Sequence, residues 1–211
     1  MGNLKRQCDV SSGREKADIV LKNGTIINVF TEELITGDVA IVGDTIVGIG
    51  DYKGNVEIDC SNKYISPGFI DAHMHIESTM VMPIELSKKL LKSGTTTIIA
   101  DPHELVNVKG ASAIDFLLES TKDIPLNVYI MVPSSVPATS FETNGVGKFS
   151  AKDMESYVNN PRILGLGEVM CFNDVINSEN EILDKLELFK NKVVDGHVPN
   201  INGKSLRSEE H

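Results

Sequence analysis

The sequence contains little cysteine and no long apolar segment. Its three cysteines, Cys8, Cys60 and Cys171, are widely spaced, and none belongs to a C-x-x-C pair. This argues against a disulfide framework and is typical of a reducing compartment. No run of about 18 apolar residues occurs, so we expect no membrane span, and residues 1–6 lack the apolar region of a secretion signal. These absences favour a cytoplasmic protein with no membrane partner.

Positive charge is also scarce. The chain has 20 Lys and Arg residues against 30 Asp and Glu residues, which gives a formal net charge of -10. Because no basic cluster interrupts this acidic background, nucleic acid is not expected as a partner. The hydrophobic content of 41% is sufficient for a buried core, and 211 residues allow one ordinary domain, or a small domain plus part of a larger one.

The first third of the chain is a polar segment followed by short apolar runs. Residues 1–16 are polar and charged and are expected to form a flexible N-terminal arm. Residues 17–66 show short strand patterns separated by turn residues, with hairpin turns predicted at Asn23-Gly24 and Gly43-Asp44. We therefore predict a small β-rich module over 17–66.

From residue 67 onwards, strand and helix patterns alternate at steps of about thirty residues, the size of a βαβ unit. Such alternation predicts a parallel sheet with helices outside. The predicted strands are 67–75, 95–100, 127–132, 162–169 and 193–197, and the predicted helices begin near Pro83, Ala111, Ser150 and Ser178. A closed barrel of this kind needs eight units. The predicted fold class is therefore α/β, a partial (β/α)8 TIM-type barrel of about five units over 67–211, preceded by the small β-rich module.

The first strand of the predicted barrel ends in two histidines. In a strand, residues i and i+2 point to the same face, so His73 and His75 can direct two imidazoles towards one metal ion. An H-x-H pair alone is a weak signal. Its position at the carboxyl end of a parallel strand strengthens it, because active sites of parallel α/β proteins lie at that end.

The other predicted strands also end in polar residues. These are Asp101, His103 and Glu104 after the second strand, Ser134 and Ser135 after the third, Glu168 in the fourth, and His197 after the fifth. Parallel neighbours would bring them to one face. Histidine and carboxylate ligands suit Zn²⁺, Mn²⁺ or Fe²⁺, and a glutamate can bridge two such ions. Two members have ordinary alternatives, since His103 could cap a helix and Glu104 could be a solvated loop carboxylate. Glu168 is harder to explain without a metal or a partner, because a buried carboxylate is costly when unpaired.

Several phrases resemble a known enzyme family. The phrase P-G-F-I-D-A-H-M-H at 67–75 resembles the first-strand signature of the amidohydrolase superfamily. The phrases A-D-P-H-E at 100–104, M-V-P-S-S-V-P-A-T at 131–139, F-E-T-N-G at 141–145, L-G-L-G-E-V-M at 164–170 and D-G-H-V-P at 195–199 are similar to those of the adenine deaminases within it.

The resemblance implies a set of roles. His73 and His75 would bind a first metal, Glu168 would bridge where most dinuclear members carry a carboxylated lysine, and His197 would bind the second metal. It also implies catalytic roles for Glu168, His103 and Glu104, and substrate contacts from Glu77, Ser134 and Ser135. The implied cofactor is two divalent ions, Mn²⁺ or Fe²⁺ with Zn²⁺ as an option. The implied reaction is hydrolysis of adenine, a small purine, to hypoxanthine and ammonia in purine salvage.

The same family pattern includes a sixth-strand histidine, an eighth-strand aspartate and a C-terminal domain, which this sequence does not supply. We therefore expect an N-terminal part of the family's chain, with His211 as a candidate for the sixth-strand ligand and a homo-oligomer formed through the open sheet edge. Two alternatives stay open. One is another cyclic-amide hydrolase of dihydroorotase type, which a fourth-strand lysine would favour and Glu168 disfavours. The other is a non-catalytic metal-binding remnant.

Overall fold

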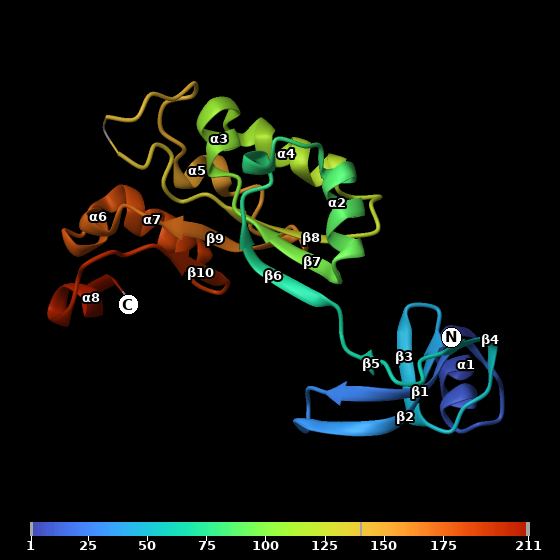
Figure 1. Ribbon diagram of the computed structural model, residues 1–211. Helices are drawn as coiled ribbons and strands as arrows, with labels where there is room; N and C mark the ends of the chain where they lie inside the picture. Colours follow the sequence, from blue (N-terminus) through green and yellow to red (C-terminus); the bar gives the residue numbers. More distant parts are fainter. Residues whose placement is uncertain (1, 140, 210–211) are drawn as a thin grey trace. The chain divides into compact units, whose positions relative to one another are not determined.

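The computed structural model describes residues 2–139 and 141–209 and divides into two compact units, Met1–Pro67 and Gly68–His211. Each unit has its own hydrophobic core. Figure 1 shows the helices and strands of both units. Within the described residues, no helix combines the length and the apolar character needed to cross a membrane.

The first unit is a mixed five-stranded sheet with one helix. Its strands have the order β3-β2-β1-β4, with β5 paired to β1. Pairing is antiparallel for β1–β2 and β2–β3, and parallel for β1–β4 and β1–β5. The elements are α1 (Gly2–Ser11), β1 (Ala17–Asn28), β2 (Glu33–Val42), β3 (Thr45–Gly50), β4 (Gly54–Asp59) and β5 (Tyr64–Ile65). A small core contains Val10, Val20 and Val42.

The segment expected to be an N-terminal arm contains helix α1, which is held by the completely buried Val10 and by an ion pair of 2.6 Å between Arg6 and Asp18. One local prediction for this unit is wrong. Asn23-Gly24 is not a hairpin turn but lies in a bulge within the continuous strand β1. The buried carboxylate of Asp38 stabilises this bulge, since it accepts the Asn23 amide at 3.0 Å.

The second unit is a parallel sheet with strands in sequential order, β6-β7-β8-β9-β10, which confirms the predicted α/β half-barrel. Its strands are β6 (Phe69–Met74), β7 (Thr95–Ala100), β8 (Asn127–Val132), β9 (Ile163–Val169) and β10 (Val193–Gly196). The helical segments are η1 (Glu77–Thr79), α2 (Pro83–Lys92), α3 (His103–Lys109), α4 (Ala111–Ser120), α5 (Ala151–Met154), α6 (Phe172–Ile176), α7 (Asn180–Phe189) and α8 (Gly203–Glu209). Figure 1 shows α2 and α4 together on one side of β7 and β8.

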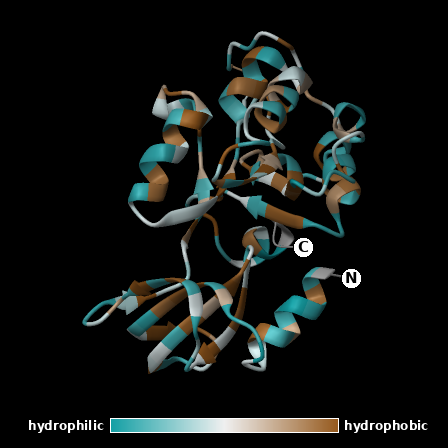
Figure 2. Ribbon diagram, turned by 90° about the vertical axis from the view of Figure 1, so that its right-hand side faces the viewer, coloured by the Kyte–Doolittle hydropathy of each residue, from teal (hydrophilic) through white to brown (hydrophobic). Residues whose placement is uncertain are grey.

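The core of this unit lies between the sheet and its helices. Apolar side chains of β7, β8, β9 and α4 belong to one buried cluster, and Figure 2 shows hydrophobic colour on both strands and helices. Completely buried members include Ile98, Ile114, Leu117, Ile130 and Leu166. Burial of this apolar surface supplies the main favourable term for folding.

The helix starts were predicted less well than the strands. The capping box of Ser150 and Asp153 is present, but the helix that it begins ends at Met154. Ser178 does not cap α7, because its φ is 58° and Glu179 occupies the N-cap position. Helix α3 was not predicted, since its first residues are the polar strand-end residues His103 and Glu104.

We predict that Leu117→Ala lowers the free energy of unfolding by about 2–5 kcal/mol, because it removes a completely buried side chain and leaves a cavity. Phe116→Ala on the same helix is the control, since Phe116 is 44% exposed and should change stability much less. Chemical denaturation measures both. Equal effects of the two substitutions would contradict the assigned core face of α4.

Candidate metal centre

The candidate site lies where the parallel strands of the second unit end. Strands β6 and β10 are the two edges of the sheet and would be about 19 Å apart if it were flat, since neighbouring strands are about 4.8 Å apart. Instead, His73 Nδ1 at the end of β6 lies 3.1 Å from Asp195 Oδ2 on β10. The sheet therefore curls strongly enough to bring side chains from both edges into one group.

His73 and His75 are oriented in the manner of metal ligands. His73 directs Nδ1 to the Asp195 carboxylate, and His75 directs Nδ1 to the backbone oxygen of Asp101 at 2.7 Å. These acceptors favour a proton on each Nδ1 and leave the lone pairs on Nε2. The two Nε2 atoms are 3.3 Å apart. Metal-bound histidines almost always make such a contact with their second ring nitrogen.

Glu168 is the carboxylate at the centre of the group. It belongs to the buried strand β9, and its side chain is only 11% exposed. Its Oε2 lies 3.5 Å from His73 Nε2, 3.7 Å from His75 Nε2 and 3.7 Å from His103 Nδ1. Its Oε1 lies 3.1 Å from His197 Nδ1. The two oxygens thus face different imidazoles.

These residues fit a divalent metal. His73, His75 and Glu168 each offer a ligand atom, and the three atoms lie within 4.8 Å of one another. The two Nε2 atoms and Glu168 Oε2 are all electron-pair donors in the tautomers described above, so a cation between them would relieve their mutual repulsion. Two further groups overlap with this one, namely His75 with His103 and Glu104, and Asp101 with His103 and Glu168. Nitrogen and oxygen donors of this kind suit Zn²⁺, Mn²⁺ or Fe²⁺.

His103 begins α3 and extends the group. Its Nδ1 lies 3.6 Å from Asp101 Oδ1, an ion-pair distance that is longer than a hydrogen bond. The interaction with the Asp101 carboxylate raises the pKa of His103 to about 8, and the charges of Glu104 and Glu168 act in the same direction. His103 Nδ1 and Asp101 Oδ1 are buried and have no hydrogen-bond partner within the described part of the chain.

Glu77 and Glu104 form a carboxyl pair beside the imidazoles. Burial raises the pKa of Glu77 to about 7, and the interaction with the Glu104 carboxylate adds to the shift. Burial opposes ionisation of Glu104, but the interaction with Glu77, the backbone amide of Glu104 and the charges of His103 and His75 together outweigh it, so the pKa of Glu104 is lowered. Glu77 Oε1 accepts the Leu105 amide at 3.2 Å, and Glu104 Oε2 lies 3.7 Å from His75. Glu77 Oε2 is buried and has no hydrogen-bond partner among the described residues.

His197 lies at the margin of the group. It follows β10, its side chain is 63% exposed, and its contact with the group is the one to Glu168 Oε1. The three-donor groups found among the described residues do not include it. His211, considered above as a further ligand, lies outside the described residues.

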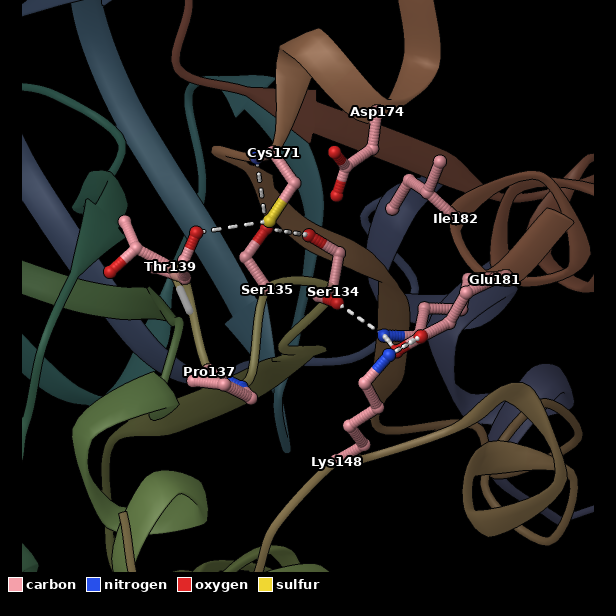
Figure 3. A pocket seen from close by; sticks show the side chains of 11 residues that line it. Ser134, Ser135, Pro137, Thr139, Lys148, Cys171, Asp174, Glu181 and Ile182 are labelled. Atoms are coloured by element: carbon pink, nitrogen blue, oxygen red, sulfur yellow. Dashed lines mark hydrogen bonds and ion pairs between the residues drawn. The ribbon is translucent and has the colours of Figure 1, made fainter. Parts of the chain in front are cut away.

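Ser134 and Ser135 are close to Glu168 but are buried behind it. Both hydroxyls donate to the Glu168 backbone oxygen, Ser134 at 2.6 Å and Ser135 at 3.3 Å. Figure 3 shows that they also line a cavity of about 190 Å³ together with Cys171 and Glu181. At this cavity the Lys185 ammonium donates to the Ser134 backbone oxygen at 2.7 Å. Burial lowers the pKa of Lys185. The serine hydroxyls therefore bind the protein's own backbone.

Two supporting residues were not assigned a role from the sequence. Asp195 orients His73, and Asp101 contacts three members of the group. Asp195 stands two residues before His197 in the strand predicted at 193–197, and the i, i+2 spacing expected of a strand could have indicated it. Asp101 stands at the end of the second strand, but its direction depends on contacts with other strands.

Fold and site together define a parallel α/β half-barrel with a cluster of histidines and carboxylates, a candidate metal site, at the carboxyl ends of its strands. A family model described as the amidohydrolase family matches residues 64–210, and the chain belongs to this family.

Curated relatives agree with this assignment. The adenine deaminase of Desulfitobacterium hafniense (strain Y51) is 52% identical over 204 residues, and that of Clostridium acetobutylicum is 50% identical over 207 residues. Each match covers 97% of this chain and 36% of the relative, so the chain spans little more than a third of the length of these relatives.

Solved structures share the fold at low identity. A D-aminoacylase superimposes with a TM-score of 0.62 at 18% identity, over 92% of this chain and 48% of that one. A D-hydantoinase gives a TM-score of 0.56 at 18% identity, over 85% of this chain and 39% of that one. Another D-aminoacylase structure, with a TM-score of 0.61, 18% identity and the same coverage, is described as having a binuclear metal center.

We predict that the purified chain binds a divalent transition ion and that His73→Ala combined with His75→Ala abolishes this binding, because the pair supplies two of three close donor atoms. Asp44→Ala combined with Asp51→Ala is the matched control, since it removes two exposed carboxylates from the other unit. Equilibrium dialysis against Mn²⁺, followed by elemental analysis, measures the bound metal. Equal metal in the wild type and the double histidine variant would contradict the site.

Proposed function

We propose that these residues form the N-terminal part of an enzyme that hydrolyses adenine to hypoxanthine and ammonia with the help of bound metal. The observation that carries the proposal is the convergence of His73, His75, His103 and Glu168 at the strand ends of the half-barrel. The relatives named adenine deaminase, at 52% and 50% identity, support adenine as the substrate. The greater part of each relative lies outside the matched region, so the activity is proposed for these residues acting together with such a region.

The proposed cofactor is two divalent ions. His73 and His75 would hold the first, His197 would hold the second, and Glu168 would bridge them through its two oxygens. We propose Mn²⁺ or Fe²⁺, with Zn²⁺ also compatible with nitrogen and carboxylate donors. When bound, such ions lower the pKa of water and supply a nucleophile at neutral pH. A fourth-strand glutamate in place of a lysine disfavours the alternative of a dihydroorotase-like enzyme.

The protein's own groups would manage the protons of the reaction. Water adds its oxygen to C6 of the purine, the bond from C6 to the exocyclic nitrogen breaks, and that nitrogen leaves as ammonia. Ring N1 and the leaving nitrogen must each gain a proton during this exchange. Glu104 and His103 lie beside the imidazole pair and are the proposed proton carriers, and Glu77, whose pKa is raised to about 7 by burial, is a further candidate. General acid and base groups of this kind work best when their pKa lies near the operating pH.

The structure favours a role for Ser134 and Ser135 other than the substrate contact expected from the sequence. Their hydroxyls donate to the Glu168 backbone oxygen, and both residues are at most 4% exposed. We propose that they support Glu168, while Glu77 with Glu104 is the better candidate for contacting the purine.

Exposed apolar residues on the edge strands support the proposal of a homo-oligomer. Phe69 and Ile70 of β6 are 63% and 64% exposed, and Val193 of β10 is 53% exposed. Unpaired strand edges are ready templates for pairing with another chain. A cytoplasmic location and a place in purine salvage are proposed with the activity.

We predict that Glu168→Gln loses at least one of the two ions, because a neutral amide cannot replace a carboxylate shared between two cations. Glu187→Gln is the control, since Glu187 is exposed and pairs with Lys190 on the outer helix. Metal content per chain, measured after dialysis, checks the result. A Glu168→Gln variant with full metal content would assign Glu168 a purely structural role.

We predict that the 211-residue chain alone releases little or no ammonia from adenine. Positioned proton transfer contributes about 10²–10⁴ in rate, and the family pattern places one of its carriers on the eighth strand. A chimaera that adds the remaining C-terminal part of the Desulfitobacterium hafniense relative should release ammonia, and a chelator should stop it. Chelator-sensitive release at an ordinary enzymatic rate by the short chain would show that the added part is dispensable. An inactive chimaera that folds and binds metal would contradict adenine deamination.

A further inference from the structure

Asp101 is the buried carboxylate at the end of β7. It is 1% exposed, and it directly precedes Pro102 and helix α3. The function proposed above gives it no task. A buried aspartate is costly unless its oxygens are occupied, so its partners indicate what it does.

The backbone of Asp101 fixes the histidine strand. Its amide donates to the Met74 oxygen at 2.9 Å, and Met74 lies between His73 and His75. Its own backbone oxygen is 2.7 Å from His75 Nδ1. One peptide segment therefore sets both the position of β6 at this point and the orientation of the His75 ring.

The side chain of Asp101 fixes the glutamate strand. Oδ2 accepts the backbone amide of Glu168 at 2.7 Å, across two strands of the sheet. Oδ1 faces His103 Nδ1 at 3.6 Å. Because the Ser134 hydroxyl donates to the Glu168 oxygen at 2.6 Å, side chains hold both polar groups of the Glu168 backbone.

Gly167 permits this contact. A Cβ at position 167 would lie 2.4 Å from Asp101 Oδ2 and 2.7 Å from its carboxyl carbon, which is closer than such atoms approach. Any side chain there would push the carboxylate away from the Glu168 amide. The contact thus depends on a glycine on one strand and an aspartate on another.

We propose that Asp101 is a positioning residue that holds Glu168, His75 and His103 in the arrangement that binds metal, an inference that rests on the metal centre proposed above. It acts through its hydrogen bond to the Glu168 backbone and through its contacts with the two imidazoles. Residues that orient metal ligands in this way typically contribute 10- to 100-fold to metal affinity.

The test is titration of the 211-residue chain with Co²⁺, followed by visible absorption, which reports both affinity and ligand geometry. Asp101→Ala should lower Co²⁺ affinity about 10- to 100-fold and change the spectrum. Asp101→Asn keeps an oxygen that can accept the Glu168 amide, so it should recover most of the affinity and the wild-type spectrum. Gly167→Ala keeps the Asp101 residue but displaces its carboxylate, so it should also weaken Co²⁺ binding. This variant tests the contact even if Asp101→Ala does not fold.

Asp115→Ala is the matched control, because it removes a carboxylate that accepts a hydrogen bond from Tyr157 at 2.8 Å in the same unit but outside the cluster. It should leave Co²⁺ binding unchanged. Wild-type affinity in folded Asp101→Ala, or in Gly167→Ala, would overturn the positioning role while leaving the metal centre intact. Equal losses of Co²⁺ affinity in Asp101→Asn and Asp101→Ala would indicate that the carboxylate is a direct metal ligand. This result would also overturn the positioning role. A wild-type chain that binds no Co²⁺ would overturn the metal centre itself, and the role of Asp101 with it.

Discussion

The curl of the parallel sheet is the constraint on which the candidate metal centre depends. Right-handed twist accumulates from strand to strand, and closure into a barrel requires the strands to tilt together. Here five strands suffice to bring His73 on one edge into contact with Asp195 on the other. The polar residues at the strand ends therefore meet as a group, whereas on a flat sheet they would form a row.

Glu168 places a carboxylate in a buried strand, and its backbone is held in position by side chains of other segments. Its strand is buried over almost its whole length, so the backbone polar groups at its end need partners within the protein. Asp101 supplies the acceptor and the two serines supply the donors. A satisfied polar network of this kind fixes one arrangement of the chain, because each alternative leaves a buried group unpaired.

The strands and the identity of the cluster could be predicted from the sequence, since both depend on local patterns. Runs such as Thr95–Ala100 are β-branched, and polar residues at the ends of parallel strands share one edge by geometry. The predictions that failed concern positions where the structure is determined by contacts between residues distant in sequence. Asn23-Gly24 has the composition of a turn, but Asp38 holds it in a bulge. Ser134 and Ser135 were placed correctly at a strand end, yet their hydroxyls turn to a backbone oxygen of another strand.

The buried ammonium of Lys185 links the outer helix layer to this network. It extends from α7 to the Ser134 backbone, and Ser134 in turn holds the Glu168 backbone. Unwinding of α7 would strip the serine segment of a charged donor and expose the cavity beneath it to water. The arrangement of the Glu168 backbone therefore depends in part on a hydrogen bond that comes from the helix layer outside the sheet.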